Sequence, residues 1–115
     1  MNAPEFLPDA GDLIWTDFDP TVGREQAGRR PALVVSPSAF VLNTGFVVVC
    51  PITAGIRPFP TSVVLPEGLP IAGEILLSHI RSIDALARPI RPVGAAIPAD
   101  TAKLVRAKLA ALIAI

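Results

Sequence analysis

One polar segment of the chain, Asp19–Pro31, concentrates side chains that could bind an anion. It holds three arginines, Arg24, Arg29 and Arg30, together with the polar residues Glu25 and Gln26. A guanidinium group presents a planar fork of donors that matches phosphate oxygens. A loop of about a dozen residues between two hydrophobic runs is more often functional than idle. We therefore expect a phosphate-gripping loop, the alternative being a solvated hairpin loop in which Glu25 pairs with an arginine.

Further polar and aromatic candidates follow along the chain. Thr53 ends the apolar run at Phe46–Thr53, where its hydroxyl could donate to an oxyanion or merely satisfy nearby backbone. The turn Arg57-Pro58-Phe59-Pro60 sets a cation beside an aromatic ring. That pairing suits single-stranded nucleic acid, although a proline-stiffened turn explains it as well. Trp15 could stack on a base, whereas we expect Phe18 in the core. On a strand, Trp15 and Thr16 must lie on opposite faces.

His79 is the one histidine of the chain, and Cys50 is its one cysteine. A lone histidine without clustered cysteines cannot build a closed metal shell, so we expect no metal and no cofactor. If Glu74–Ile83 is one strand, His79 and Arg81 share a face and form a candidate acid/base element. The alternative is a partly exposed structural histidine. We expect Cys50 to be inert core.

The elements that must position these residues are short strands. Thirteen prolines and eight glycines in 115 residues argue against a helix bundle. Six segments are rich in β-branched and aromatic residues: Leu13–Phe18, Ala32–Ser36, Phe46–Thr53, Ser62–Leu65, Glu74–Ile83 and Ile90–Ala96. The run Phe46–Cys50 predicts a central strand buried on both faces, with Pro51 at a bulge or where the strand leaves the sheet.

The end of the chain changes to a helical period. Pro98 suits a first helical position, and Asp100 complements a helix N-terminus. The apolar residues of one helical stripe are Ala102, Val105, Leu109 and Leu112. Strands followed by one helix predict a mainly β fold, a small antiparallel barrel or sandwich with a C-terminal helix. We assign residues 1–115 to a single domain.

Composition limits the class of protein. Hydrophobic residues make up 51% of the chain and charged residues 17%, which excludes intrinsic disorder. No apolar run approaches the roughly 18 residues of a membrane span, and Met1–Asp12 lacks the basic leader of a signal peptide. We expect a soluble, cytoplasmic protein. Net charge is zero, yet from position 20 onward ten basic residues face five acidic ones. A basic face for nucleic acid is therefore compatible with the neutral balance.

Two stretches, Gly11–Pro20 and Gly23–Pro37, strongly resemble the opening of the MazF/PemK toxin family. The second contains the specific motif Glu-Gln-x-Gly-x-Arg-Pro at Glu25–Pro31. The resemblance continues in order through Pro51–Thr53, the Arg57-x-Phe59-Pro60 turn, Arg81–Asp84 and the terminal helix. It covers nearly the whole chain.

The resemblance implies an SH3-like (MazF/CcdB-type) barrel, a homodimer, and a toxin neutralised by a MazE-like antitoxin. It implies a sequence-specific, metal-independent endoribonuclease that cleaves single-stranded RNA, usually mRNA, and so inhibits translation and growth. Where the motifs match, the resemblance implies that Arg30 is the catalytic arginine and Thr53 the catalytic threonine. We expect the remaining residues to bind RNA or shape the loop: Trp15, Arg24, Glu25, Gln26, Arg29, Arg57 and Phe59.

Catalysis of this kind needs no protein nucleophile, because the 2′-hydroxyl of RNA attacks the phosphate and leaves 2′,3′-cyclic phosphate and 5′-hydroxyl ends. Arg30 and Thr53 suit stabilisation of the charge that develops on the phosphate. Many relatives carry an acidic residue and Gln where this chain has Ser78 and His79. The carboxylate base of those relatives is therefore absent, and His79 is a candidate acid or base. The alternative function is a CcdB-like poison that binds DNA gyrase without chemistry.

Overall fold

Seven strands, two helices and one 3-10 helix make up the part of the chain that the computed structural model describes, residues 6–18 and 29–115. The strands are β1 (Asp12–Asp17), β2 (Arg29–Val34), β3 (Phe46–Thr53), β4 (Ser62–Val64), β5 (Glu74–Leu76), β6 (Arg81–Asp84) and β7 (Ile90–Ala96). The helices are α1 (Ser38–Thr44), the 3-10 helix η1 (Leu77–His79) and α2 (Ala99–Leu112).

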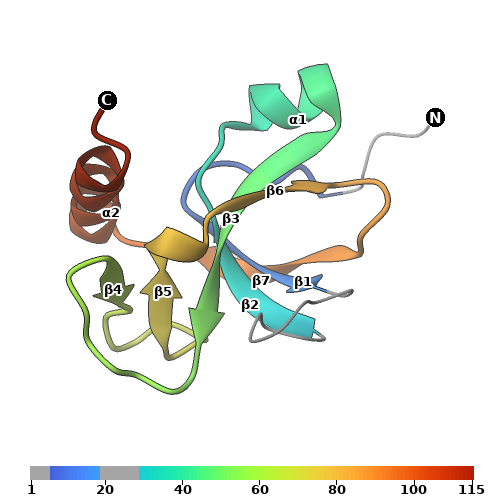
Figure 1. Cartoon of the computed structure of the whole chain (residues 1–115). Helices are drawn as coiled ribbons and strands as arrows, with labels where there is room; N and C mark the ends of the chain where they lie inside the picture. The colour runs from blue at the N-terminus through green and yellow to red at the C-terminus, as the bar shows by residue number, and fades with distance from the viewer. Residues whose placement is uncertain (1–5, 19–28) are drawn as a thin grey trace.

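All strand pairs are antiparallel, and the strand order is β4-β5-β3-β2-β1-β7, with β6 also paired to β3 (Figure 1). The sheet is open, because no hydrogen-bonded ladder among the described residues joins its two end strands, β4 and β7. The predicted mainly β class with a C-terminal helix is confirmed. Closure of the sheet into a barrel is not seen.

Alternate residues of the strands pack into two hydrophobic cores on opposite faces of the sheet. Leu13, Leu33 and Cys50 belong to a first cluster, which also takes Val105 from α2. Ile14, Ala32 and Val49 belong to a second cluster with Phe18 and Val41 of α1. The period-two alternation of a strand explains this division. Both faces of β3 therefore carry buried residues, as predicted, although Phe46 at its start is exposed and Val48 is half-buried.

The expected single strand over Glu74–Ile83 is wrong, because η1 divides it into β5 and β6. Both strands pair with β3: Ile52 lies opposite Ile75, and Val49 lies opposite Arg81. Moving three residues along β3, from Ile52 to Val49, thus corresponds to moving six residues from Ile75 to Arg81, and the extra residues form η1. Its Leu77 is fully buried, which anchors this turn in the first core.

Three other expectations need correction. The seven-residue helix α1 was not predicted, and it ends at Gly45, whose φ of 78° is the left-handed conformation that glycine adopts most readily. Arg29–Pro31 belongs to β2 rather than to the preceding loop. Pro51 stays within β3, opposite Ala32 of β2, just before β3 begins to pair with β5 on its other edge.

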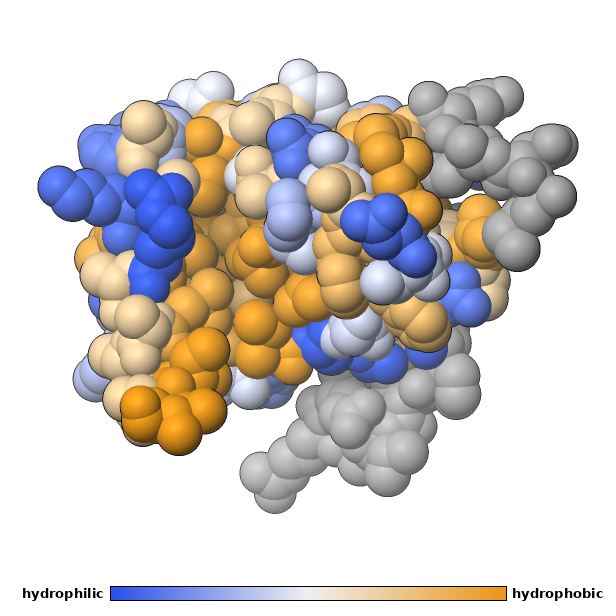
Figure 2. Space-filling view, turned by 90° about the horizontal axis from the view of Figure 1, so that it is seen from above, coloured by the Kyte–Doolittle hydropathy of each residue, from blue (hydrophilic) through white to orange (hydrophobic). Residues whose placement is uncertain are grey.

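Helix α2 confirms the helical period at the end of the chain. Val105 and Thr101 are buried against the sheet, whereas Leu112 at the end of the predicted stripe is exposed. The exposed apolar residues of this region are Leu104, Leu112, Ile113 and Ile115. Figure 2 shows apolar surface gathered on the side of the molecule that carries α2. Within the described ranges, no helix is long and apolar enough to cross a membrane.

Candidate active site

Arg30 and Thr53 lie on neighbouring strands at one end of the sheet. The ladder between β2 and β3 runs from Val34 opposite Val49 to Ala32 opposite Pro51. Continued by two residues, this register aligns Arg30 with Thr53. By strand alternation, both residues share the face of Ala32 and Val49, which is the face of the second core. The two residues assigned to catalysis from the resemblance therefore occur on one face.

Thr16 extends this row onto β1, where it is the direct partner of Arg30. Its side chain is 1% exposed, and its Oγ1 has no hydrogen-bond partner among the described residues. A buried hydroxyl without a partner costs about 1–3 kcal/mol, so most are satisfied. Alternation along β1 predicted that Thr16 and Trp15 point to opposite faces. The missing partner could not be read from the sequence.

Arg81 adds a second guanidinium near the end of the second core. It is the partner of Val49 on β6, and its Cζ lies 5.6 Å from the centroid of the Phe18 ring. Phe18 is 2% exposed, so its predicted core position is confirmed. His79, in contrast, is exposed at the end of η1. The expected strand face shared by His79 and Arg81 is wrong, because η1 breaks the alternation.

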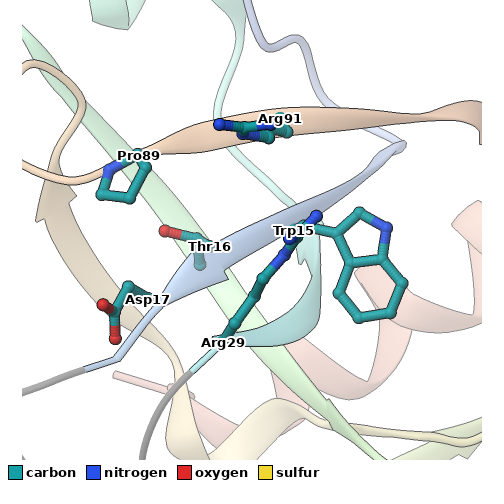
Figure 3. Close-up of a pocket in the computed structure, with 6 residues that line it drawn as sticks. All are labelled: Trp15, Thr16, Asp17, Arg29, Pro89 and Arg91. Carbon is teal, nitrogen blue, oxygen red and sulfur yellow. The ribbon is translucent and has the colours of Figure 1, made fainter.

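Trp15 and Arg29 form a separate group on the other face of the sheet. The Arg29 guanidinium lies 5.4 Å from the Trp15 ring centroid, a cation–π contact. Arg91 of β7 is the strand partner of Trp15. Together with Thr16, Asp17 and Pro89, these residues line a hollow of about 190 Å³ (Figure 3). An aromatic ring beside two guanidiniums can stack on a base and hold a phosphate.

The end of β1 that borders this hollow is fixed by hydrogen bonds from Arg88 and from the neighbouring strand β7. Arg88 Nη1 donates a hydrogen bond of 2.8 Å to the Asp17 carbonyl oxygen, at the end of β1. Strand β1 also pairs with β7 through Thr16 opposite Ile90. The end of β1 that carries Trp15 and Thr16 is therefore fixed on both sides.

The segment after Thr53 leaves the sheet as an exposed turn. Thr53 Oγ1 accepts a hydrogen bond of 3.3 Å from the Gly55 backbone N–H, so the local backbone role weighed for this hydroxyl does occur. Its own proton stays available for donation. The Arg57 side chain is exposed, and Phe59 is 66% exposed. Both of these predicted RNA-binding side chains are thus accessible.

Two residues of the β5 segment contact the end of β3 and were not identified from the sequence. Glu74 is the strand partner of Thr53 and is 2% exposed. Hydrogen bonds from the Ser62 hydroxyl and from the Arg57 backbone lower the pKa of the Glu74 carboxyl, and nearby Lys108 lowers it further. Gly73 has a φ of 152°, and a Cβ there would lie 2.6 Å from the Thr53 carbonyl oxygen. The signal available in the sequence was the pair Gly73-Glu74 at the start of an apolar run, where a glycine and a charged residue are unusual.

Three predicted residues, Arg24, Glu25 and Gln26, lie outside the described residues. Cys50 is fully buried, as predicted, and burial raises the pKa of its thiol to about 12. In the described part of the chain, no group of three or more His, Cys, Asp or Glu residues is arranged to hold a metal ion.

Comparison with known proteins gives consistent matches. Residues 9–113 match the family model described as PemK-like, MazF-like toxin of type II toxin-antitoxin system. The endoribonuclease toxin MazF of Escherichia coli K12 is 42% identical over 108 residues, which is 94% of this chain and 96% of that protein. The endoribonuclease EndoA of Bacillus subtilis is 37% identical over 64% of this chain and 68% of its own length.

Solved structures agree with these matches. MazF from Deinococcus radiodurans superimposes with a TM-score of 0.89 at 42% identity, covering 96% of this chain and 100% of that one. MazF in a MazE–MazF complex from the same organism gives a TM-score of 0.83 at 39% identity, covering 96% and 99% of the two chains.

Proposed function

Because the chain belongs to the PemK-like, MazF-like family of toxins, we propose that it is the toxin of a toxin–antitoxin system and an endoribonuclease. The observation that carries the proposal is the common face of Arg30 and Thr53, at the end of the second core. Its substrate is single-stranded RNA, chiefly mRNA, which it cleaves at specific short sequences in the cytoplasm. Residues 1–115 act as one toxin domain.

The reaction is an attack of the RNA 2′-oxygen on the adjacent phosphorus. A P–O bond forms to the 2′-oxygen while the bond to the 5′-oxygen breaks, which leaves a 2′,3′-cyclic phosphate and a 5′-hydroxyl. Arg30 donates hydrogen bonds to the phosphate oxygens as negative charge accumulates there. The Thr53 hydroxyl donates to the same group. Catalysis then follows from donors arranged before the charge develops, with no protein nucleophile.

Two protons must move in this reaction: one leaves the 2′-hydroxyl and one reaches the departing 5′-oxygen. Arginine is a poor general base because its guanidinium group stays protonated in proteins. His79 is exposed, and an imidazole can both accept and donate a proton, so we propose it as the proton-transfer group. The wild-type pH–rate profile should then contain an inflection that His79→Gln removes. Identical profiles for the two proteins would reject this role.

RNA is held by the aromatic and basic residues around this centre. Trp15 and Arg29 supply a stacking surface and a cation in the hollow of Figure 3. Arg57 and Phe59 do the same on the exposed turn after Thr53. Arg24, Glu25 and Gln26 complete the binding loop. Stacking on such side chains contributes about 1–3 kcal/mol per base.

The partners are a second copy of this chain and a MazE-like antitoxin. Exposed leucine and isoleucine side chains on and after α2 support burial against a partner. A gyrase poison that works by binding alone has no need of the Arg30–Thr53 pair. The endoribonuclease names of the similar proteins likewise favour RNA cleavage over gyrase binding.

The decisive experiment maps the ends of a long RNA after incubation with the purified protein in EDTA. We expect fragments with 2′,3′-cyclic phosphate and 5′-hydroxyl ends. Arg30→Ala should lower the rate by roughly 10²–10³ or more, the usual effect of removing one charge-stabilising donor. Arg106→Ala, on the exposed surface of α2, is the matched control and should cleave normally. Normal cleavage by folded Arg30→Ala would contradict the catalytic assignment.

A further inference from the structure

Glu74 is the one buried charged side chain in the part of the chain that the structure describes, and the reaction above gives it no role. It sits at 2% exposure on β5, between Thr53 of β3 and Val64 of β4. Burying a carboxylate is unfavourable unless hydrogen bonds and charges compensate it. A carboxylate kept at such a position is therefore expected to organise something specific.

Both carboxylate oxygens accept hydrogen bonds, one from the turn that follows Thr53 and one from the first residue of β4. Oε1 accepts a hydrogen bond of 2.8 Å from the Arg57 backbone N–H. Oε2 accepts a hydrogen bond from the Ser62 hydroxyl. Ser62 Oγ in turn accepts the Phe59 backbone N–H at 3.3 Å. Glu74 thus holds the backbone of Arg57 directly and that of Phe59 through one hydroxyl.

The direction of the Ser62 proton follows from its neighbours. The Phe59 carbonyl oxygen lies 3.0 Å from Ser62 Oγ, but it already accepts the Ser62 backbone N–H. The ionised carboxylate is the stronger acceptor, so the hydroxyl donates to Glu74. Lys108 of α2 donates to the Ser62 carbonyl oxygen at 2.7 Å and sets a positive charge nearby. This network links α2, β4, β5 and the turn.

The two residues whose backbone is held carry the exposed side chains assigned to RNA. Arg57 and Phe59 project their side chains into solvent while their N–H groups point to the buried network. We propose that Glu74 is a positioning residue for RNA recognition, fixing this turn so that the Arg57 guanidinium and the Phe59 ring are presented next to Thr53. The inference rests on the proposed ribonuclease function and deepens it.

The test separates binding from chemistry. Glu74→Gln keeps the shape of the side chain, but it removes the charge and replaces one acceptor by a donor. KM for a short cleavable RNA should rise roughly tenfold, the effect of losing one ordering interaction of about 1.4 kcal/mol, while kcat stays within about twofold because Arg30 and Thr53 are untouched. Glu67→Gln is the matched control: it is the same substitution at an exposed position between β4 and β5 and should change neither constant.

A double-mutant cycle tells positioning from a general loss of structure. In the Arg57→Ala/Phe59→Ala protein the turn has no RNA-binding side chains left to position, so adding Glu74→Gln should raise KM by less than about twofold. An additive increase, a fall in kcat at unchanged KM, or a result equal to that of Glu67→Gln would each overturn the inference. If Glu74→Gln does not fold, Ser62→Ala takes its place in the same cycle. It keeps the carboxylate and its bond from Arg57, and it removes the hydroxyl that joins Glu74 to Phe59.

The wild-type protein separates this inference from the proposed function. Its binding to the same RNA with a 2′-O-methyl group at the cleavage site is measured by fluorescence anisotropy beside the cleavage assay. A wild type that neither binds nor cleaves RNA overturns the ribonuclease function and, with it, the role of Glu74. A wild type that does both, with a Glu74→Gln variant indistinguishable from Glu67→Gln, overturns the role of Glu74 alone.

Discussion

Gly73→Ala should displace the proposed catalytic Thr53 without touching a catalytic side chain. A Cβ at residue 73 would lie 2.6 Å from the Thr53 carbonyl oxygen and 2.8 Å from Ile52 Cγ2, where ordinary contacts begin at 3.4 Å. The backbone must therefore move by up to about 0.8 Å, and a misplacement near 1 Å can reduce a rate ~10²-fold. We expect kcat for RNA cleavage to fall roughly 10- to 100-fold.

Gly68→Ala is the matched control for this substitution. Gly68 also has a positive φ, of 93°, so alanine is strained there as well, but a Cβ would meet nothing within 4 Å. Strain of this kind costs about 1–3 kcal/mol, which lowers stability in both variants. Single-turnover cleavage is measured well below the melting temperature of each protein. If folded Gly73→Ala cleaves RNA as fast as folded Gly68→Ala, the coupling between β5 and Thr53 is refuted.

Three further predictions follow from burial and from the stacking site. Because the pKa of the Cys50 thiol is raised to about 12, a thiol reagent at pH 8 should modify the unfolded chain at least ~10²-fold faster than the native one. The free energy of unfolding should also fall as pH rises above ~8.5, because the thiol of the unfolded chain ionises before that of the folded one. The lowered pKa of the Glu74 carboxyl means that its ionised form stabilises the fold above the unfolded pKa of about 4.3 and that this contribution is lost as pH falls through the folded value. The urea midpoints of wild type and Glu74→Gln should therefore converge as pH falls from about 4.3 through the folded pKa. A constant difference between the two midpoints over that range would contradict this prediction. Trp15→Ala should weaken binding of a 2′-O-methyl RNA by about 1–3 kcal/mol, measured by anisotropy, whereas unchanged affinity would remove Trp15 from the RNA site.

The strands that the sequence predicted correctly are those whose patterns are local. The run Phe46–Thr53 and the segment Ile90–Ala96 have the bounds of β3 and β7, because β-branched residues and turn signals decide them. The break within Glu74–Ile83 depends instead on two different registers against β3. A register offset is a property of the folded sheet, so composition within the segment carries no trace of it.

The candidate site shows the same division between local and long-range information. Period two correctly assigned Trp15 and Thr16 to opposite faces, and the motif at Glu25–Pro31 singled out Arg30. Neither pattern could align Arg30 with Thr53, which comes much later in the chain, because that alignment follows from the register between β2 and β3. The partners of Glu74 come from two further elements and were equally beyond a local pattern.

The resulting arrangement suits a reaction that depends on placement more than on reactive groups. Thr16 pairs with Arg30, and Thr53 pairs with Glu74. The β2–β3 register, extended by two residues beyond Ala32 and Pro51, aligns Arg30 with Thr53, so one row crosses four strands. Adjacent strands lie about 4.8 Å apart, which lets donors from two of them approach a single phosphate group from either side. Each strand is held by its neighbours in the sheet, so these donors need little rearrangement as charge develops on the phosphate. In the proposed reaction, fixed spacing between strands is therefore what stabilises that charge, and the outermost residue of the row, Glu74, fixes the turn that carries Arg57 and Phe59.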